Sequence, residues 1–169
     1  LLFIFLGVIA YMDILQYFVG EEYRSGLKVV PILLAANLCL GVYYNLSVWY
    51  KVSDKTIYGA YISIIGAVVT LVLNYLLVPQ FGYMGAAYTT LICYFLIMVI
   101  CWAFGQKYYP VKYPLKRLFL YTMLAFGLFL LMNNNTIANI PLKLFVNSIL
   151  LLAFAVVAYW FELRKALKR

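Results

Sequence analysis

Asp13 is the residue of this chain best placed to do chemistry, because its carboxylate interrupts a long apolar run. At about 1.5 Å of rise per residue, it lies about 10 Å inside the outer end of its predicted helix. Gln16 and Tyr17 share its face of that helix. A carboxylate at such depth in a membrane is costly and normally faces a water-filled cavity or binds a cation. The alternative is that Asp13 pairs with Arg24 or Lys28 and only joins helices.

Arg24 and Lys28 follow this helix and are the next residues with chemical potential. Two cations close together could hold a phosphate. The same pair is also typical of an interfacial anchor that faces lipid headgroups. Both interpretations stay open at this point.

A polar stripe runs along the next apolar segment, where Asn37, Tyr44 and Asn45 share one helical face. Asparagine between membrane helices often forms an interhelical hydrogen bond worth about 1 kcal/mol or less. The other possibility is that the stripe lines a wet cavity. We therefore regard these three residues, together with Asp13 and Gln16, as candidates for a polar path through the membrane.

The sequence contains few of the residue patterns that enzymes use for catalysis. It contains no histidine, and Cys39, Cys93 and Cys101 all lie in apolar stretches without the spacing of metal ligands or disulfides. Paired carboxylates, a nucleophile with its base and a phosphate-binding glycine loop are also missing from the sequence. We predict no catalytic site, no metal and no other cofactor.

The elements that must position these residues are membrane-spanning helices. Apolar residues make up 67% of the chain and charged residues 11%, whereas soluble domains have about 45–50% and about 25%. Backbone polar groups must be paired within lipid, so the sequence predicts an all-α integral membrane protein. The six predicted spans cover about 1–19, 29–50, 58–78, 83–104, 116–132 and 142–161. The first span begins without Met or a basic segment, which predicts a piece of a longer protein.

Cations are distributed unevenly among the connectors between these spans. Arg24, Lys28 and Lys143 lie on one side of the membrane, and the other ten of the 13 Lys and Arg residues lie on the opposite side. The positive-inside rule makes that second side cytoplasmic, including the basic C-terminal tail. Trp49, Trp102 and Trp160 end spans on this side, where the indole N–H can stay in water. The net charge of +8 then indicates anionic membrane lipids as partners and not nucleic acid.

The spans differ in composition, which predicts different surroundings for them. The third span carries small or polar residues every three or four positions, a pattern that lets helices pack closely in membranes. These residues are Gly59, Ser63, Gly66, Thr70 and Asn74. The fifth and sixth spans are apolar on nearly every face, so we expect them at the periphery of the bundle.

One segment resembles a known family. The stretch NYLLVPQFGYMGAAYTT, from Asn74 to Thr90, is similar to the helix–turn–helix signature of polysaccharide flippases, with Pro79 ending one helix. Glu21 to Thr56 resembles the segment that precedes it in that family, the polysaccharide transporters of the multidrug, oligosaccharidyl-lipid and polysaccharide exporter superfamily. The residues of the predicted helix-packing motif are Asn74, Pro79, Gly82, Gly85, Ala86 and Ala87.

This resemblance implies a fold of two lobes around a central cavity, in which the six spans correspond to helices nine to fourteen. Residues 1–104 would then be four core helices of the C-terminal lobe, and residues 105–169 two peripheral helices with the tail. The partner would be an N-terminal lobe of the same protein, without which this segment is not expected to transport. Relatives move polyprenyl-diphosphate-linked oligosaccharide from the cytoplasmic to the outer leaflet of the bacterial inner membrane.

Three other functions stay open from the sequence. A cation-coupled multidrug antiporter of the same superfamily would use an intramembrane carboxylate such as Asp13. A membrane-embedded glycan polymerase or ligase needs a large outer loop with reactive residues, and the outer connectors here are short. A membrane scaffold without transport activity is the fourth possibility.

Overall fold

A computed structural model describes residues 2–108, 115–133 and 140–166. Every regular element in these ranges is a helix, which confirms the predicted all-α class. The elements are α1 (Leu2–Ala10), α2 (Met12–Phe18), η1 (Glu21–Val29), α3 (Val30–Leu46), α4 (Val48–Val52), α5 (Ile57–Phe81), α6 (Tyr83–Tyr108), α7 (Leu115–Asn133) and α8 (Ile140–Ala166). The side chains of the predicted basic tail and of Trp160 lie outside the described residues.

Three helical stretches in the described ranges are long and apolar enough to cross a membrane: Gly26–Val52, Ile57–Phe81 and Tyr83–Tyr108. Each exceeds the roughly 20 residues that bilayer hydrocarbon requires. Within α7 and α8, the described apolar stretches Leu120–Leu131 and Lys143–Val156 are shorter. The helices therefore indicate a membrane protein, and three of the six predicted spans meet the length and composition of a membrane crossing.

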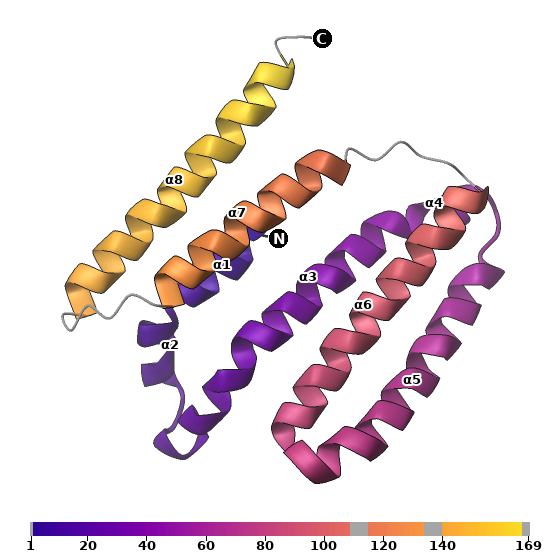
Figure 1. Cartoon of the computed structure of the whole chain (residues 1–169), viewed down its shortest axis with the longest axis horizontal. Helices are drawn as coiled ribbons and strands as arrows, with labels where there is room; N and C mark the ends of the chain where they lie inside the picture. Colours follow the sequence, from indigo (N-terminus) through magenta and orange to yellow (C-terminus); the bar gives the residue numbers. More distant parts are fainter. Residues whose placement is uncertain (1, 109–114, 134–139, 167–169) are drawn as a thin grey trace. The chain divides into compact units, whose positions relative to one another are not determined.

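The first predicted span, 1–19, is wrong as one continuous helix. It is divided at Tyr11 into α1 and α2, and Figure 1 shows the chain changing direction there. Neither helix alone reaches the length that crosses a bilayer. The sequence holds no proline or glycine at the division.

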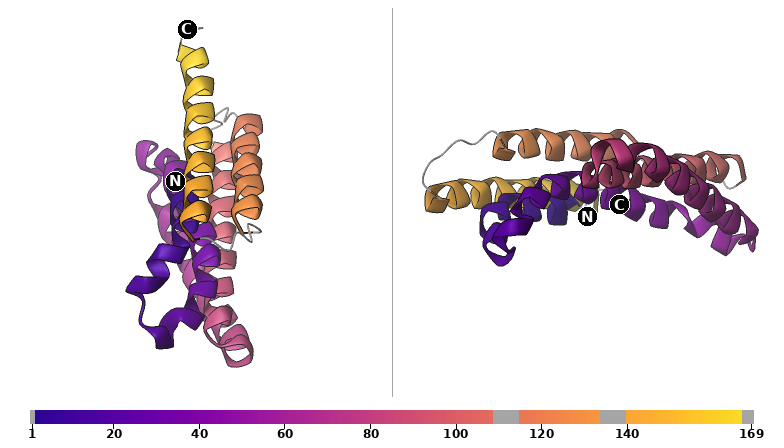
Figure 2. Two further views of the ribbon diagram at one scale, coloured as in Figure 1. Left: turned by 90° about the vertical axis from the view of Figure 1, so that its left-hand side faces the viewer. Right: turned by 90° about the horizontal axis from the view of Figure 1, so that it is seen from below.

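The chain forms two compact units, one made of Leu1–Arg24 with Pro114–Arg169 and the other of Ser25–Tyr113. In the Ser25–Tyr113 unit, α6 lies between α3 and α5 and contacts both along its length (Figures 1 and 2). The core of this unit consists of Tyr43, Leu46, Trp49, Tyr50, Ile62, Ile97 and Cys101. The boundary expected between residues 104 and 105 from the family resemblance stays a prediction.

The turn between α5 and α6 contains two glycines of the predicted helix-packing motif. Gly82 ends α5 with a positive φ of 56°, a conformation that favours glycine. A Cβ on Gly85 would lie 2.4 Å from the carbonyl oxygen of Leu77, so only glycine lets the helices meet so closely. The prediction that Pro79 ends the helix is wrong, because α5 continues to Phe81 and the N–H of Gly82 still bonds the carbonyl of Val78.

Trp49 also departs from its predicted environment. Its indole N–H was expected in water at the interface, but the residue is only 4% exposed. The ring stacks on Tyr108 with 6.0 Å between centroids and contacts Tyr50 and Tyr58. A Cβ on Gly105 would lie 3.1 Å from the indole, so this glycine makes room for it. Aromatic rings from α4, α5 and α6 thus close one end of the unit over Trp49.

In the other unit, α1 contacts both α7 and α8. Its core is formed by Leu6, Ala10, Ala125, Leu151 and Phe154. Phe5 of α1 also packs against Phe129 of α7, with 5.9 Å between ring centroids. These three helices position the polar side chains at the division between α1 and α2.

Candidate functional site at the division between α1 and α2

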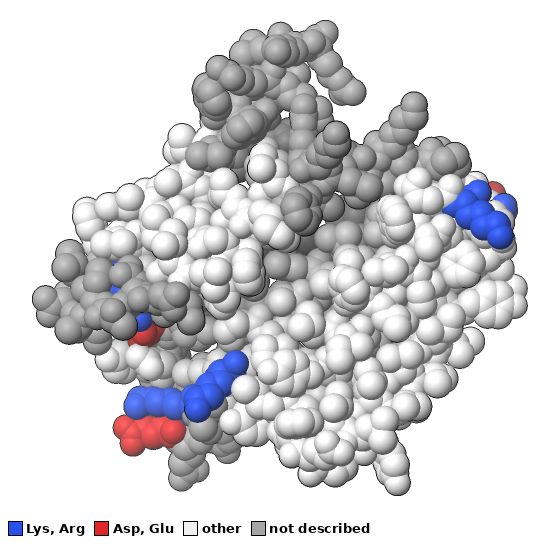
Figure 3. Space-filling model, in the orientation of Figure 1, with Lys and Arg blue, Asp and Glu red and all other residues white. Residues whose placement is uncertain are grey.

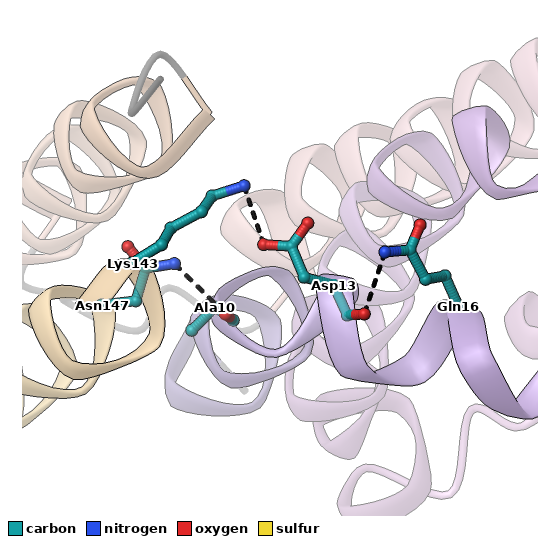
Figure 4. Close-up of polar contacts among 5 residues, drawn as sticks. All are labelled: Ala10, Asp13, Gln16, Lys143 and Asn147. Atoms are coloured by element: carbon teal, nitrogen blue, oxygen red, sulfur yellow. Dashed lines mark hydrogen bonds and ion pairs between the residues drawn. The ribbon is translucent and has the colours of Figure 1, made fainter. Parts of the chain in front are cut away.

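The division between α1 and α2 exposes a backbone carbonyl to a side chain of α8. The N–H of Ile14 donates to the carbonyl of Tyr11, at 3.0 Å, three residues back. The carbonyl of Ala10, four residues back, instead accepts a hydrogen bond of 3.2 Å from Nδ2 of Asn147 (Figure 4). A side chain inserted into the helical ladder is an established cause of a kink. Asn147 therefore supplies the contact that the sequence could not reveal.

Asp13 forms an ion pair with Lys143 of α8, with 2.7 Å between Oδ2 and Nζ (Figure 4). The expectation that Asp13 pairs with Arg24 or Lys28 is wrong. The two side chains are 28% and 24% exposed, so water screens the pair only in part. Asp13 lies in the first turn of α2, where the helix dipole favours a negative charge. Lys143 lies near the start of α8, where the dipole opposes its charge, and Asp13 compensates for this.

A third contact joins α8 to Tyr11, the residue between α1 and α2. The hydroxyls of Tyr11 and Ser148 lie 2.9 Å apart. Asn147 is itself 2% exposed, and among the described residues its Oδ1 has no hydrogen-bond partner. Lys143, Asn147 and Ser148 are four and five positions apart and lie on one face of α8. The prediction that 142–161 is apolar on nearly every face overlooked this polar stripe, although its helical spacing is visible in the sequence.

The other predicted residues of this region have local partners. Gln16 donates from Nε2 to the backbone carbonyl of Asp13, at 3.0 Å (Figure 4). Arg24 donates from Nε to the backbone carbonyl of Gln16, at 3.3 Å, and pairs with Glu21 at 3.6 Å. Lys28 is exposed and forms no ion pair with a described residue. Gln16 therefore contacts Asp13 only through its backbone carbonyl, and Arg24 contacts the backbone of Gln16.

Asn37, Tyr44 and Asn45 belong to the Ser25–Tyr113 unit. Both asparagines donate from Nδ2 to the carbonyl four residues earlier in α3, each at 2.9 Å. All three side chains are exposed, and the Tyr44 ring is 59% exposed. None of these contacts joins α3 to another helix. Their predicted place on a transport path stays a prediction.

The predicted helix-packing motif is divided between buried and exposed positions. Gly85 and Ala87 are buried, whereas Ala86 is exposed. Asn74 has its Oδ1 buried without a hydrogen-bond partner among the described residues. Further along the pair, the hydroxyl of Thr70 lies 3.1 Å from the sulfur of Cys93. Small and polar residues therefore join α5 to α6, as their spacing predicted.

The described residues contain no group of three or more His, Cys, Asp or Glu side chains able to hold a metal ion. The site contains the Asp13–Lys143 ion pair and the amide side chain of Asn147 beside the divided helix. Such an arrangement can hold two helices together and can release them if another ion competes for either charge. No protein-family model, curated protein or solved structure matches this chain.

Proposed function

We propose that the chain is part of a bacterial inner-membrane flippase that moves polyprenyl-diphosphate-linked oligosaccharide to the outer leaflet for cell-surface polysaccharide. The observation that carries the proposal is the α5–α6 hairpin. The segment that resembles polysaccharide flippases contains the turn of this hairpin and the close contact between its two helices. The Gly82 turn and the Gly85 contact with Leu77 give that segment a physical role. The three long apolar helices support a membrane location.

On this proposal the chain crosses the membrane six times, with its C-terminus in the cytoplasm. The short helices α1 and α2, together with α7 and α8, would complete their crossings against an N-terminal lobe of the same protein. A divided membrane helix with freed backbone groups is typical of transporters, where it lies beside the substrate or coupling-ion path. Asp13 and Lys143 are charged residues beside such a division, which supports placing them on the path.

The diphosphate needs cations along its path. Lys28 has no ion pair among the described residues and is free to meet a phosphate at the mouth. Arg24 would first have to leave the exposed carboxylate of Glu21, a weak partner in water. Lys143 is a third candidate, since a phosphate can compete with Asp13 for its ammonium group.

The test uses a strain that lacks the gene encoding this chain. We expect lipid-linked oligosaccharide to accumulate on the inner leaflet and the wild-type gene to reverse this. Asp13→Asn and Lys143→Gln should each reverse it less well, whereas Gly127→Ala, where a Cβ meets nothing within 4 Å, serves as the matched control. Normal distribution of the lipid-linked oligosaccharide in the deletion strain would refute the proposal.

The second candidate is a cation-coupled multidrug antiporter, and the Asp13–Lys143 pair is the observation that favours it. A carboxylate that exchanges a lysine for an external cation could couple ion movement to export. In the same strain, this function predicts unchanged oligosaccharide distribution and a loss of cation-dependent dye efflux. The two measurements therefore separate the candidates.

A further inference from the structure

Three exposed lysines lie at one end of the Ser25–Tyr113 unit, where aromatic rings pack around Trp49. Lys51 lies in the last turn of α4, Lys55 lies in the connector to α5, and Lys107 lies in the last turn of α6. Figure 3 shows basic side chains, with an acidic one beside them, over this end of α6. None of the three forms an ion pair with a described residue. These lysines are referred to below as the lysine end.

Two of the lysines share one aromatic ring. The ammonium of Lys55 lies 4.8 Å from the centroid of the Tyr108 ring, and that of Lys107 lies 5.7 Å from it. Both distances are within the range of a cation–π interaction. The ring cannot swing freely, because Trp49 stacks on it and Tyr58 packs against it with 5.0 Å between centroids. Tyr108 thus holds two positive charges near fixed positions.

The backbone fixes the lysine end as well. The N–H of Lys55 donates to the carbonyl of Tyr50, at 2.9 Å, and the N–H of Tyr58 donates to the carbonyl of Lys55, at 3.1 Å. The connector therefore folds back over α4. Asp54 is the acidic residue of this connector, and it is exposed and has no ion pair with a described residue. Two like charges on one ring repel each other, and a phosphate between them would remove that repulsion.

The depth of the lysine end matches phospholipid headgroups. All three stretches that are long and apolar enough to cross a membrane begin or end here, at Val52, Ile57 and Tyr108. Tyrosine and tryptophan gather at this level of membrane proteins, between the hydrocarbon and water. The positive-inside rule places this end in the cytoplasm, where the leaflet carries anionic lipids.

We propose that Lys55 and Lys107, held on Tyr108 and flanked by Lys51, form a binding site for the phosphate of an anionic phospholipid headgroup. The lipid is a glycerophospholipid with one net negative charge and no cationic headgroup amine. A choline headgroup brings its own cation and would meet three lysines, so it should be excluded. This inference does not rest on the proposed function, because the site serves a membrane protein of any activity.

The test purifies the full chain in detergent and counts retained lipids by native mass spectrometry after adding phosphatidylglycerol or phosphatidylcholine. We expect preferential retention of one phosphatidylglycerol. The double variant Lys55→Gln/Lys107→Gln should lower this preference by roughly tenfold or more, since each lysine near an anionic surface contributes appreciably. Lys55→Arg/Lys107→Arg and Tyr108→Phe are the matched controls and should keep it, whereas Tyr108→Leu should weaken it. Circular dichroism checks that each variant stays helical.

Four outcomes would overturn the inference. The first is equal retention of the two lipids, and the second is a Lys55→Gln/Lys107→Gln variant that keeps its preference for phosphatidylglycerol. The third is complete displacement of phosphatidylglycerol by millimolar inorganic phosphate, which would make the site a receptor for free phosphate. Retention of a polyprenyl phosphate without retention of phosphatidylglycerol would equally contradict it, because the site would then recognise the cargo and not a bilayer lipid.

Discussion

Different interactions stabilise each of the two compact units of this chain internally. In Ser25–Tyr113, long helices pack through glycines and aromatic rings, and Asn37 and Asn45 bond their own helix. In the other unit, the helices before residue 25 are short and divided, and polar side chains cross from α8 to the division. A helix long enough to cross a membrane satisfies its own backbone. A divided helix must take partners from elsewhere, and these partners can be exchanged during function.

The largest expected effect on stability comes from Gly85→Ala, which tests the close glycine packing of the Ser25–Tyr113 unit. A Cβ at this position meets the Leu77 carbonyl at 2.4 Å, so Gly85→Ala must separate α5 from α6 near their turn. Overpacking of this kind costs about 1–3 kcal/mol of stability. Thermal unfolding in detergent, followed by near-ultraviolet circular dichroism, should show a clearly lower midpoint. Gly127→Ala is the matched control, and equal midpoints for the two variants would contradict the packing described here.

Removing one charge of the Asp13–Lys143 pair should have the next largest effect. Asp13→Asn or Lys143→Gln leaves the other charge partly buried, at a cost of about 1–2 kcal/mol, below the value for a fully buried pair. The double variant should cost less than the sum of the two single variants, because neither charge is then left alone. Unfolding free energies of all four proteins give the coupling. Strict additivity would show that the two side chains do not interact.

Asn147→Leu tests the cause of the helix division. The Ala10 carbonyl loses its donor, and an unpartnered buried carbonyl costs about 1–2 kcal/mol. Ser148→Ala removes an exposed hydrogen bond to Tyr11 and a bond to the Leu144 carbonyl of its own helix, but leaves the Ala10 carbonyl its donor, so it should cost less and serves as the control. The rate of hydrogen exchange at the amide of Ile14 is a second measurement of whether the helix stays divided. Unchanged exchange in Asn147→Leu would mean that α1 and α2 divide without help from α8.

The smallest effect is expected in the other unit, at the asparagines of α3. Their side chains bond the carbonyls of Leu33 and Gly41 in the same helix and are exposed. Asn37→Ala and Asn45→Ala should each change the unfolding free energy by less than about 0.5 kcal/mol. A loss as large as that of Asn147→Leu would mean that these residues join helices, and the contrast between the two units would fail.

Local patterns in the sequence predicted the α5–α6 pair well. Gly82 marked the turn, and the small residues that lead to Thr70 predicted the face that meets α6. Both signals act over a few residues, so no distant contact is needed to interpret them. Pro79 was misjudged for a similar reason, because a proline near a helix end removes one backbone hydrogen bond without stopping the two residues that follow.

The candidate site could be predicted only in part, because its decisive partners are distant in the sequence. Asp13 was identified because a carboxylate is energetically costly in an apolar membrane segment. Its partner Lys143, however, lies in the last helix. The carbonyl of Ala10 and the amide of Asn147 are 137 positions apart. Nothing local at Tyr11 signals a division of the helix. A polar residue on one helix could be found from the sequence, whereas its choice of partner depended on the folded chain.

The most direct test of the proposed function reconstitutes the protein into liposomes. A fluorescent polyprenyl-diphosphate-linked oligosaccharide is placed in both leaflets, and an added quencher reports how much of it is accessible from outside. We predict that the inner-leaflet fraction becomes accessible within the assay with wild-type protein and much more slowly with Asp13→Asn. Accessibility that stays at the level of protein-free liposomes would contradict a flippase function for this chain.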